Sequence, residues 1–143
     1  MTGSGLSQRL RRVIDALPLD SGTRVLEVGG APGAAAREVA RRVGPSGHVL
    51  VVDRSAKGVA LVERTAAEEI ADGRLGVRCV RVEEAQLAAG EAPFDLAFAC
   101  RVGVLDGRHP AERRLAVTAL RSMLVPGGPI YVDTGDPLVR LDD

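Results

Sequence analysis

The sequence predicts an α/β fold in which a mainly parallel sheet is covered by helices on both faces. Short apolar segments typical of strands alternate along the chain with amphipathic helical segments, which is the pattern of right-handed βαβ units. The segment H-V-L-V-V-D at residues 48–53 is almost uninterruptedly apolar, as in a strand that is buried on both sides. We therefore expect three layers with the sheet in the middle.

Apolar periodicity and helix-breaking residues place each element in turn. Apolar residues recur at helical spacing up to Pro18, which ends the first helix. Ser55 is placed to cap the third helix, and Asp72-Gly73 ends it. The expected elements are, in chain order, helix 7–17, strand 25–28, helix 34–43, strand 48–53, helix 56–71, strand 77–82, strand 94–100, helix 110–124 and strand 130–133.

The second half of the chain carries further expectations. Residues 77–82 alternate as V-R-C-V-R-V, which indicates a strand partly open to solvent and suits the edge of a sheet. Residues 83–92 are expected to form a mostly helical or irregular connection. Pro110 fits the first turn of the last helix. The buried stripe of that helix is expected to comprise Leu115, Ala119, Leu120, Met123 and Leu124.

Length and composition are those of one soluble globular domain. The chain has 143 residues, of which 45% are hydrophobic and 27% charged. We divide it into an N-terminal helix (1–20), a core (24–133) and a tail (134–143). No stretch approaches the ~20 consecutive apolar residues that span a bilayer, and the first residues lack a secretory signal, so we expect a cytoplasmic protein without a membrane partner. A net charge of zero argues against nucleic acid as a partner.

Candidate functional residues lie at two strand ends. Residues 25–33 are V-L-E-V-G-G-A-P-G, a strand that breaks into a glycine-rich turn, with Glu27 two residues before Gly29. Glycine lets the backbone pass close to a ligand because no Cβ stands in the way. Asp53 ends the next strand, where a carboxylate can accept hydrogen bonds from both hydroxyls of a ribose. The pattern predicts a nucleoside-like cofactor at the carboxyl edge of the sheet.

These residues resemble the class I S-adenosylmethionine-dependent methyltransferases. Residues 27–33 look like that family's first motif, an acid followed by a G-x-G-x-G turn, although the middle glycine is Ala31 here. The match continues in order over residues 24–133. Its later landmarks are Asp53 after the second strand, Glu83 after the third, F-D-L-A-F-A at 94–99 as the fourth, and L-V-P-G-G-P-I-Y-V at 124–132 as the turn and fifth strand.

The resemblance implies a Rossmann-like sandwich with strand order 3-2-1-4-5. The family commonly adds a sixth strand and an antiparallel seventh, and we expect both to be missing because only residues 134–143 follow the fifth strand. The open edge of that strand favours a homodimer. Cys79 and Cys100 would lie roughly 14 Å apart in this strand order, so we expect two free thiols rather than a disulfide.

The resemblance also implies a site for S-adenosylmethionine and its product S-adenosylhomocysteine. The glycine turn would pass beneath the methionine part, with Glu27 near the amino group through water. Asp53 would bind the ribose, and Glu83 with the backbone of Glu84 would approach the adenine. The expected cofactor-binding residues are Glu27, Gly29, Gly30, Ala31, Gly33, Asp53, Arg54, Glu83, Glu84 and Arg101.

A nicotinamide cofactor is the alternative ligand for the glycine turn. Its G-x-G-x-x-G fingerprint, started at Gly29, fails at Ala31 and Ala34. No metal site is expected, because two cysteines are too few for zinc without several other ligands.

The segment after the fourth strand is expected to contact the methyl acceptor. His109 is the first candidate for a general base and Asp106 the second, while Arg101 or Arg108 could anchor an anionic group. An equal alternative is that His109 caps the helix that begins near Pro110. We expect His48 to be structural and Cys100 to be a small buried thiol rather than a nucleophile.

The chain lacks motifs that are typical of methyltransferases acting on nucleic acids or proteins. The expected acceptor is therefore a small molecule, methylated on oxygen or nitrogen. The N/D-P-P-Y/F motif of amino-methylating enzymes is replaced by A-C-R-V at residues 99–102, and the single lysine, Lys57, cannot supply the two lysines of ribose 2′-O-methyltransferases. The alternative is a cofactor-binding protein without transferase activity, or a subunit completed by a partner, because the chain has no cap domain to enclose an acceptor.

Overall fold

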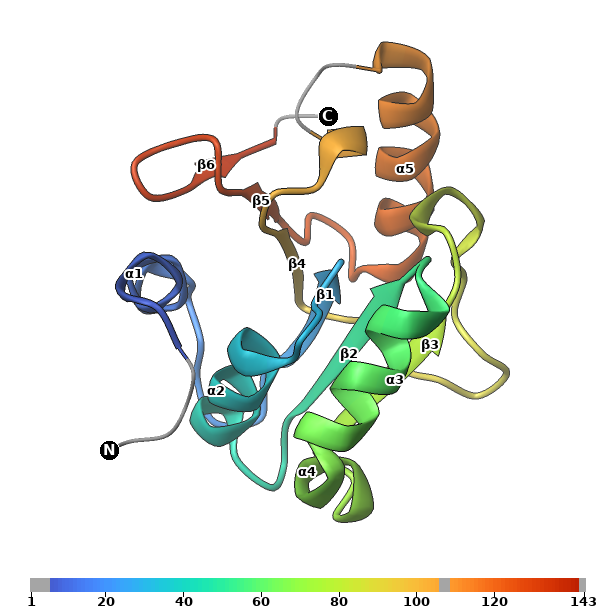
Figure 1. Ribbon diagram of the computed structural model, residues 1–143. Coiled ribbons are helices and arrows are strands. Elements are labelled where there is room, and N and C mark those ends of the chain that lie inside the picture. The colour runs from blue at the N-terminus through green and yellow to red at the C-terminus, as the bar shows by residue number, and fades with distance from the viewer. Residues whose placement is uncertain (1–5, 106–108, 142–143) are drawn as a thin grey trace.

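The structure is a computed structural model that describes residues 6–105 and 109–141. One sheet of order β3-β2-β1-β4-β5-β6 runs through it (Figure 1). Strands β1 to β5 are parallel and follow the expected order, and β6 is antiparallel to β5. The strands are β1 Arg24–Val28, β2 His48–Asp53, β3 Leu75–Cys79, β4 Leu96–Ala99, β5 Ile130–Val132 and β6 Val139–Arg140.

Strand β1 lies between β2 and β4 and sets the level at which all three strands end. Its last residue, Val28, is paired with Val52 on one side and Ala99 on the other. The chain therefore leaves the sheet three times at the same edge, through Gly29, Asp53 and Cys100. Ligands of open parallel sheets bind beyond this carboxyl edge.

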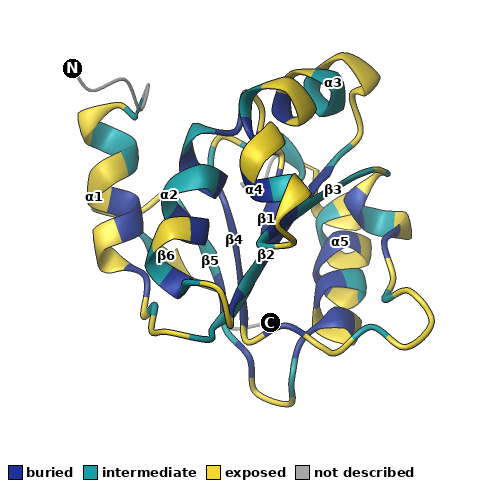
Figure 2. Ribbon diagram, turned by 90° about the horizontal axis from the view of Figure 1, so that it is seen from below, coloured by how far each residue is buried: buried dark blue, intermediate teal, exposed yellow. Residues whose placement is uncertain are grey.

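Helices cover both faces of the sheet, which confirms the expected three layers. The α1 to α4 side has a core that includes Val13, Val39 and Val62, and the α5 side has a core that includes Val82 and Leu120. Figure 2 shows the buried colour along the central strands and the inner side of α5. The helices are α1 Gln8–Ala16, α2 Ala34–Val43, α3 Ala56–Thr65, α4 Ala67–Ala71 and α5 Pro110–Met123, with 3-10 turns η1 Val82–Glu84 and η2 Gly103–Leu105.

Three expected boundaries are wrong. The helix expected over residues 56–71 is two helices, because the buried Ala66 has φ −108° and ψ 28° and interrupts it. Strand β3 spans Leu75–Cys79 rather than 77–82, since Val80 and Val82 pack against the core on the α5 side. Strand β4 starts only at Leu96, although Phe94 forms an isolated bridge to Leu124.

The buried stripe of α5 differs from the expected one. Leu115 is 60% exposed, whereas Ala116, Val117, Leu120 and Met123 are buried. Apolar residues at 115, 116, 117, 119 and 120 fit two stripes that differ by one residue, about 100° around the helix. Packing against η1 and η2 selects the stripe.

The tail forms a strand, which corrects the expectation that none follows β5. In β6, Arg140 pairs with Tyr131 and Val139 with Val132, so β5 is not an edge strand. The homodimer was inferred from an open β5 edge, and that premise no longer holds. Among the described residues, no helix is both long and apolar enough to cross a membrane.

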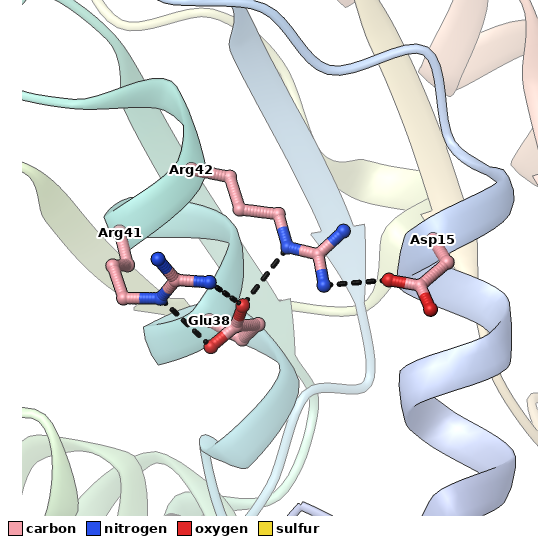
Figure 3. A network of polar contacts seen from close by, with 4 residues as sticks. All are labelled: Asp15, Glu38, Arg41 and Arg42. Carbon is pink, nitrogen blue, oxygen red and sulfur yellow. Dashed lines mark hydrogen bonds and ion pairs between the residues drawn. The ribbon is translucent and has the colours of Figure 1, made fainter.

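A polar network joins α1 to α2 (Figure 3). The Glu38 carboxylate on α2 accepts hydrogen bonds from Arg41 and from Arg42 Nε at 2.9 Å, and Arg42 Nη2 also donates to Asp15 on α1 at 2.6 Å. The hydrogen bond from Arg41 has the largest effect on the pKa of Glu38. Together with Arg42 it lowers the pKa of Glu38 to about 2, against the opposing effect of burial.

We expect Glu38→Gln to lower the free energy of unfolding at neutral pH by about 1–2 kcal/mol, less than the full pKa shift implies because solvent screens the arginines. The pKa of Glu38 is lower in the folded chain than in the unfolded one, so its contribution is present above pH 4.5 and is lost as the pH falls toward 2. In urea unfolding, the difference from wild type should shrink from neutral pH to about pH 3. The exposed Glu63 on α3 provides the control variant Glu63→Gln. A deficit that does not shrink in acid would contradict the prediction.

Candidate functional site

A hollow of about 530 Å³ lies at the carboxyl edge of the sheet. Its volume is in the range of small-molecule sites. It is lined by residues that follow β1, β2, β3 and β4 and by the start of α5. The predicted site residues that it brings together are Gly29, Asp53, Arg54, Glu83, Arg101 and His109.

The other predicted residues do not line this hollow. Glu27, Gly30 and Gly33 are buried behind Gly29, and Ala31 is exposed next to them. Glu84 is exposed and lies outside the lining. Asp106 and Arg108 lie outside the described residues, so their proposed roles stay predictions.

The glycine turn is tightly enclosed. Gly29 has φ +71° and donates its N–H to the carbonyl of Val52 at 2.7 Å. A Cβ on Gly29 would stand 3.1 Å from Val102 Cγ2, and one on Gly30 would stand 2.8 Å from Val51 Cγ1. Real Cβ atoms do not approach other atoms as closely as 2.8 Å, so the turn requires glycine for space at Gly30 and for conformation at Gly29.

The departure at Ala31 is accommodated by helix α3. A Cβ on Gly58 would stand 3.2 Å from the Ala31 methyl and 3.1 Å from Asp53 Oδ2. The missing side chain at Gly58 therefore leaves room for both groups. A glycine inside a helical pattern often has such a packing reason, and this signal in the sequence could have linked Gly58 to the site.

Asp53 has one oxygen engaged and one available. Its Oδ1 accepts the backbone N–H of Ser55 at 2.9 Å, which fixes the carboxylate at the start of α3. No other described residue donates a hydrogen bond to its Oδ2. Asp53 lines the hollow, so this oxygen can accept from a ligand hydroxyl.

Glu83 reaches the hollow from a different element than expected. It lies in η1 and not at the end of β3. Its carboxylate pairs with Arg81 at 3.0 Å, and Arg81 also lines the hollow. Burial alone would raise the pKa of Glu83, but a backbone hydrogen bond and Arg81 outweigh it, so the pKa of Glu83 is lowered and the group is ionised at neutral pH.

Glu27 is a buried carboxylate without a full set of partners. It is 3% exposed, and its Oε1 has no hydrogen-bond partner in the structure as described. Burial, and secondarily the charge of Asp53, raises the pKa of Glu27 to about 8. A buried polar atom left unsatisfied costs about 1–3 kcal/mol, so this group favours a cationic or hydrogen-bond-donating ligand close to the glycine turn.

After β4, residues 101–104 form a wall of the hollow, and this wall together with His109 carries the residues expected to contact the methyl acceptor. Arg101 has the left-handed φ of +56°. His109 occupies the N-cap position of α5, as the capping alternative expects, but its side chain makes no capping hydrogen bond, so the ring is available to the hollow that it lines. Burial, followed by the charge of Glu27, raises the pKa of Cys100 to about 12, which keeps this thiol protonated and unreactive at neutral pH.

Two expected structural roles agree with the structure. His48 Nδ1 lies 2.9 Å from the carbonyl oxygen of Gly73, at the amino end of β2. Cys79 and Cys100 are both free thiols. Within the described ranges, no group of three or more His, Cys, Asp or Glu side chains is arranged to hold a metal ion.

A second hollow, of about 770 Å³, lies between α5 and the β5–β6 end of the sheet. It is larger, but none of the described candidate residues lines it. We assign the site to the smaller hollow because that one joins the ends of the central strands.

We expect the free energy of unfolding of the ligand-free protein to fall as the pH rises from about 4.5 to about 8. The reason is that the pKa of Glu27 is about 8 in the folded chain and 4.5 in the unfolded chain. The protonated carboxyl is compatible with burial below pH 4.5, and this contribution to the free energy of unfolding is lost as the pH rises through the folded pKa. Glu27→Gln should remove most of this decline in urea unfolding. The exposed Glu84 provides the control variant Glu84→Gln, which should leave the decline in the free energy of unfolding unchanged. An equal decline in Glu27→Gln and wild type would show that Glu27 is not its cause.

Comparison with known proteins gives the same architecture. Residues 25–128 match the protein family described as Methyltransferase domain. The ubiquinone/menaquinone biosynthesis C-methyltransferase UbiE of Bordetella avium is 30% identical over 112 residues, which cover 78% of this chain and 40% of UbiE.

Solved structures of other proteins have a similar fold. An S-adenosylmethionine-dependent methyltransferase from Thiobacillus denitrificans, in complex with S-adenosyl-L-homocysteine, is 20% identical with a TM-score of 0.68, over 92% of this chain and 50% of that one. The [4+2]-cyclase SpnF is 27% identical with a TM-score of 0.68, over 86% of this chain and 42% of that one.

The chain thus spans less than half the length of its curated relative, and the family match covers most of the chain itself. Strands β2, β3 and β4, most of β1, the glycine turn after β1 and Asp53 at the end of β2 fall within residues 25–128. The chain belongs to the class I S-adenosylmethionine-dependent methyltransferases.

Proposed function

We propose that this protein binds S-adenosylmethionine in the hollow at the carboxyl edge and transfers its methyl group to a small-molecule acceptor. The observation that carries the proposal is the convergence of Gly29, Asp53 and Glu83 on one hollow, near the buried carboxylate of Glu27, whose Oε1 lacks a hydrogen-bond partner. S-adenosylmethionine is the cofactor of the family.

The residues present fit this cofactor. The open oxygen of Asp53 suits the ribose hydroxyls, and the ionised Glu83 suits a hydrogen-bond donor of the adenine edge. Glu27 supplies an acceptor for the amino group of the methionine part, directly or through water. The absence of a side chain at Gly29, which lines the hollow, leaves the backbone accessible to the ligand.

When bound, the cofactor supplies an activated methyl group on a sulfonium. The protein's own contribution is alignment, which is a large effect when it fixes the acceptor in line with the bond that breaks. In this proposal, His109 accepts a proton from an acceptor hydroxyl or ammonium, and Arg101 holds an anionic group; both residues line the hollow, which supports these roles. UbiE is a C-methyltransferase by name, so carbon joins oxygen and nitrogen as a possible acceptor atom.

Cofactor binding without methyl transfer is the second candidate function. SpnF shares the fold and is named as a cyclase, so the fold also serves chemistry other than methyl transfer. The chain also spans less than half of UbiE and of SpnF, and residues that enclose the acceptor could come from a partner. This candidate keeps the same cofactor site and differs only in the reaction.

Asp53→Ala should weaken the binding of S-adenosylhomocysteine by about 1–3 kcal/mol, or roughly 5- to 150-fold in Kd, because ribose hydrogen bonds are lost. Isothermal calorimetry measures it, with NAD and NADP as competing ligands. Asp95→Ala is the matched control, because Asp95 accepts the N–H of Arg24 at 2.8 Å at the opposite edge of the sheet. Binding of NAD in place of S-adenosylhomocysteine would overturn the cofactor assignment.

A tritiated-methyl assay should label small molecules and leave RNA, DNA and protein unlabelled. His109→Ala should reduce the rate at saturating cofactor by about 10²–10⁴-fold if the ring accepts a proton, without changing cofactor affinity. Label mainly in a macromolecule would overturn the acceptor class. Tight cofactor binding without any label would favour the second candidate function.

A further inference from the structure

Asp133, the residue directly after β5, joins two distant parts of the chain. Its side chain is only 10% exposed. Its Oδ1 accepts the backbone N–H of Arg101 at 3.0 Å, and its Oδ2 accepts from Arg9 Nη1 of α1 at 2.7 Å. One oxygen therefore holds the wall of the hollow, and the other holds the N-terminal helix.

The bond to Arg101 falls where the backbone is strained. Among the described residues, Arg101 is the one non-glycine with a positive φ, +56°. The left-handed conformation costs a non-glycine residue about 1–2 kcal/mol, and it persists only where the surroundings impose it. The hydrogen bond that Asp133 accepts from the Arg101 N–H is such a constraint.

This turn determines where the wall of the hollow lies. Val102, Gly103 and Val104 follow Arg101 and line the hollow. Val102 Cγ2 lies 3.1 Å from the point where a Cβ on Gly29 would stand, so the wall is in close contact with the glycine turn. A change in the backbone at Arg101 would move Val102 relative to Gly29.

We propose that Asp133 is a positioning residue of the cofactor site, which holds Arg101 in its left-handed conformation and keeps the wall of residues 101–104 against the glycine turn. Arg9 balances the charge of the nearly buried carboxylate. The role rests on the assignment of the hollow as the cofactor site, but the hydrogen bond to Arg101 can be tested without any ligand.

The competing explanation is that Asp133 only docks α1. Three variants separate the two roles. Arg9→Ala removes the ion pair and leaves the Asp133–Arg101 bond, Asp133→Asn keeps an oxygen that can accept from Arg101, and Asp133→Ala removes both contacts. Asp136→Ala is the matched control, because it breaks another ion pair of α1, between Arg12 and the 89% exposed Asp136, without touching the wall.

Two measurements on the full chain give the readout. Amide hydrogen exchange by NMR reports the Arg101 N–H in the ligand-free protein, and calorimetry reports the Kd of S-adenosylhomocysteine. Asp133→Ala should speed Arg101 exchange at least about tenfold and raise the Kd about tenfold. Asp133→Asn should restore both to within about threefold of wild type. Arg9→Ala and Asp136→Ala should lower the melting temperature and leave both values within about twofold.

Two results would overturn the proposal. One is an Arg9→Ala variant that binds as weakly as Asp133→Ala, and the other is an Asp133→Ala variant that loses only thermal stability. If Asp133→Ala does not fold, weaker binding by Arg9→Ala than by Asp133→Asn overturns it. Failure of the wild-type chain to bind S-adenosylhomocysteine would contradict the cofactor assignment, while the exchange of the Arg101 N–H would still decide the role of Asp133.

Discussion

The parallel pairing of β1 with both β2 and β4 is the constraint on which the site depends. Because Val28 stands opposite Val52 and Ala99, the chain turns out of the sheet three times at one level. The residues that follow these strands are brought together by backbone ladders and buried apolar side chains on both faces. They need no attraction for one another, which leaves their polar groups free for a ligand.

The buried Glu27 differs from the carboxylates that are paired with arginines. Glu38 on α2 and Glu91 in the loop before β4 accept hydrogen bonds from arginines that lower their pKa values, and these pairs favour the folded chain. Behind the glycine turn, Glu27 is buried with an unsatisfied oxygen and a raised pKa. An arrangement that opposes folding persists where function requires it, and this contrast distinguishes Glu27 from the carboxylates that are paired with arginines, including Glu83 in the lining of the hollow.

The sequence predicted the elements that are defined by their own residues. Helices α1 and α2 and strands β1 and β2 lie within one residue of their expected bounds, because apolar periodicity, Ser7 and Gly44 specify them locally. The shift of β3, the break at Ala66 and the strand β6 depend on contacts between distant segments. The α5 stripe was ambiguous for the same reason, since only its neighbours choose between Leu115 and Ala116.

The site shows the same limit. Gly29, Asp53, Arg101 and His109 line the hollow and were found from the sequence because they follow strands or begin a helix. Glu83 was found as a residue but placed on the wrong element. Val102 was expected only as part of the segment after β4, and Asp133 was missed, because their contacts with Gly29 and Arg101 join positions 73 and 32 residues apart, a distance that no local pattern marks. Gly58 was missed although its place inside a helical segment is a local signal.

The close packing of Ala31 against Gly58 restricts which residues can replace either one during evolution. The methyl group at position 31 occupies space that a side chain at position 58 would need. A lineage could therefore acquire a larger residue at position 58 only with a change of Ala31 to glycine and a shift of the Asp53 carboxylate, whose Oδ2 lies 3.1 Å from the point where a Cβ at position 58 would stand. Among homologues the two positions should covary, with one small residue exchanged for the other across the boundary between the cofactor turn and helix α3.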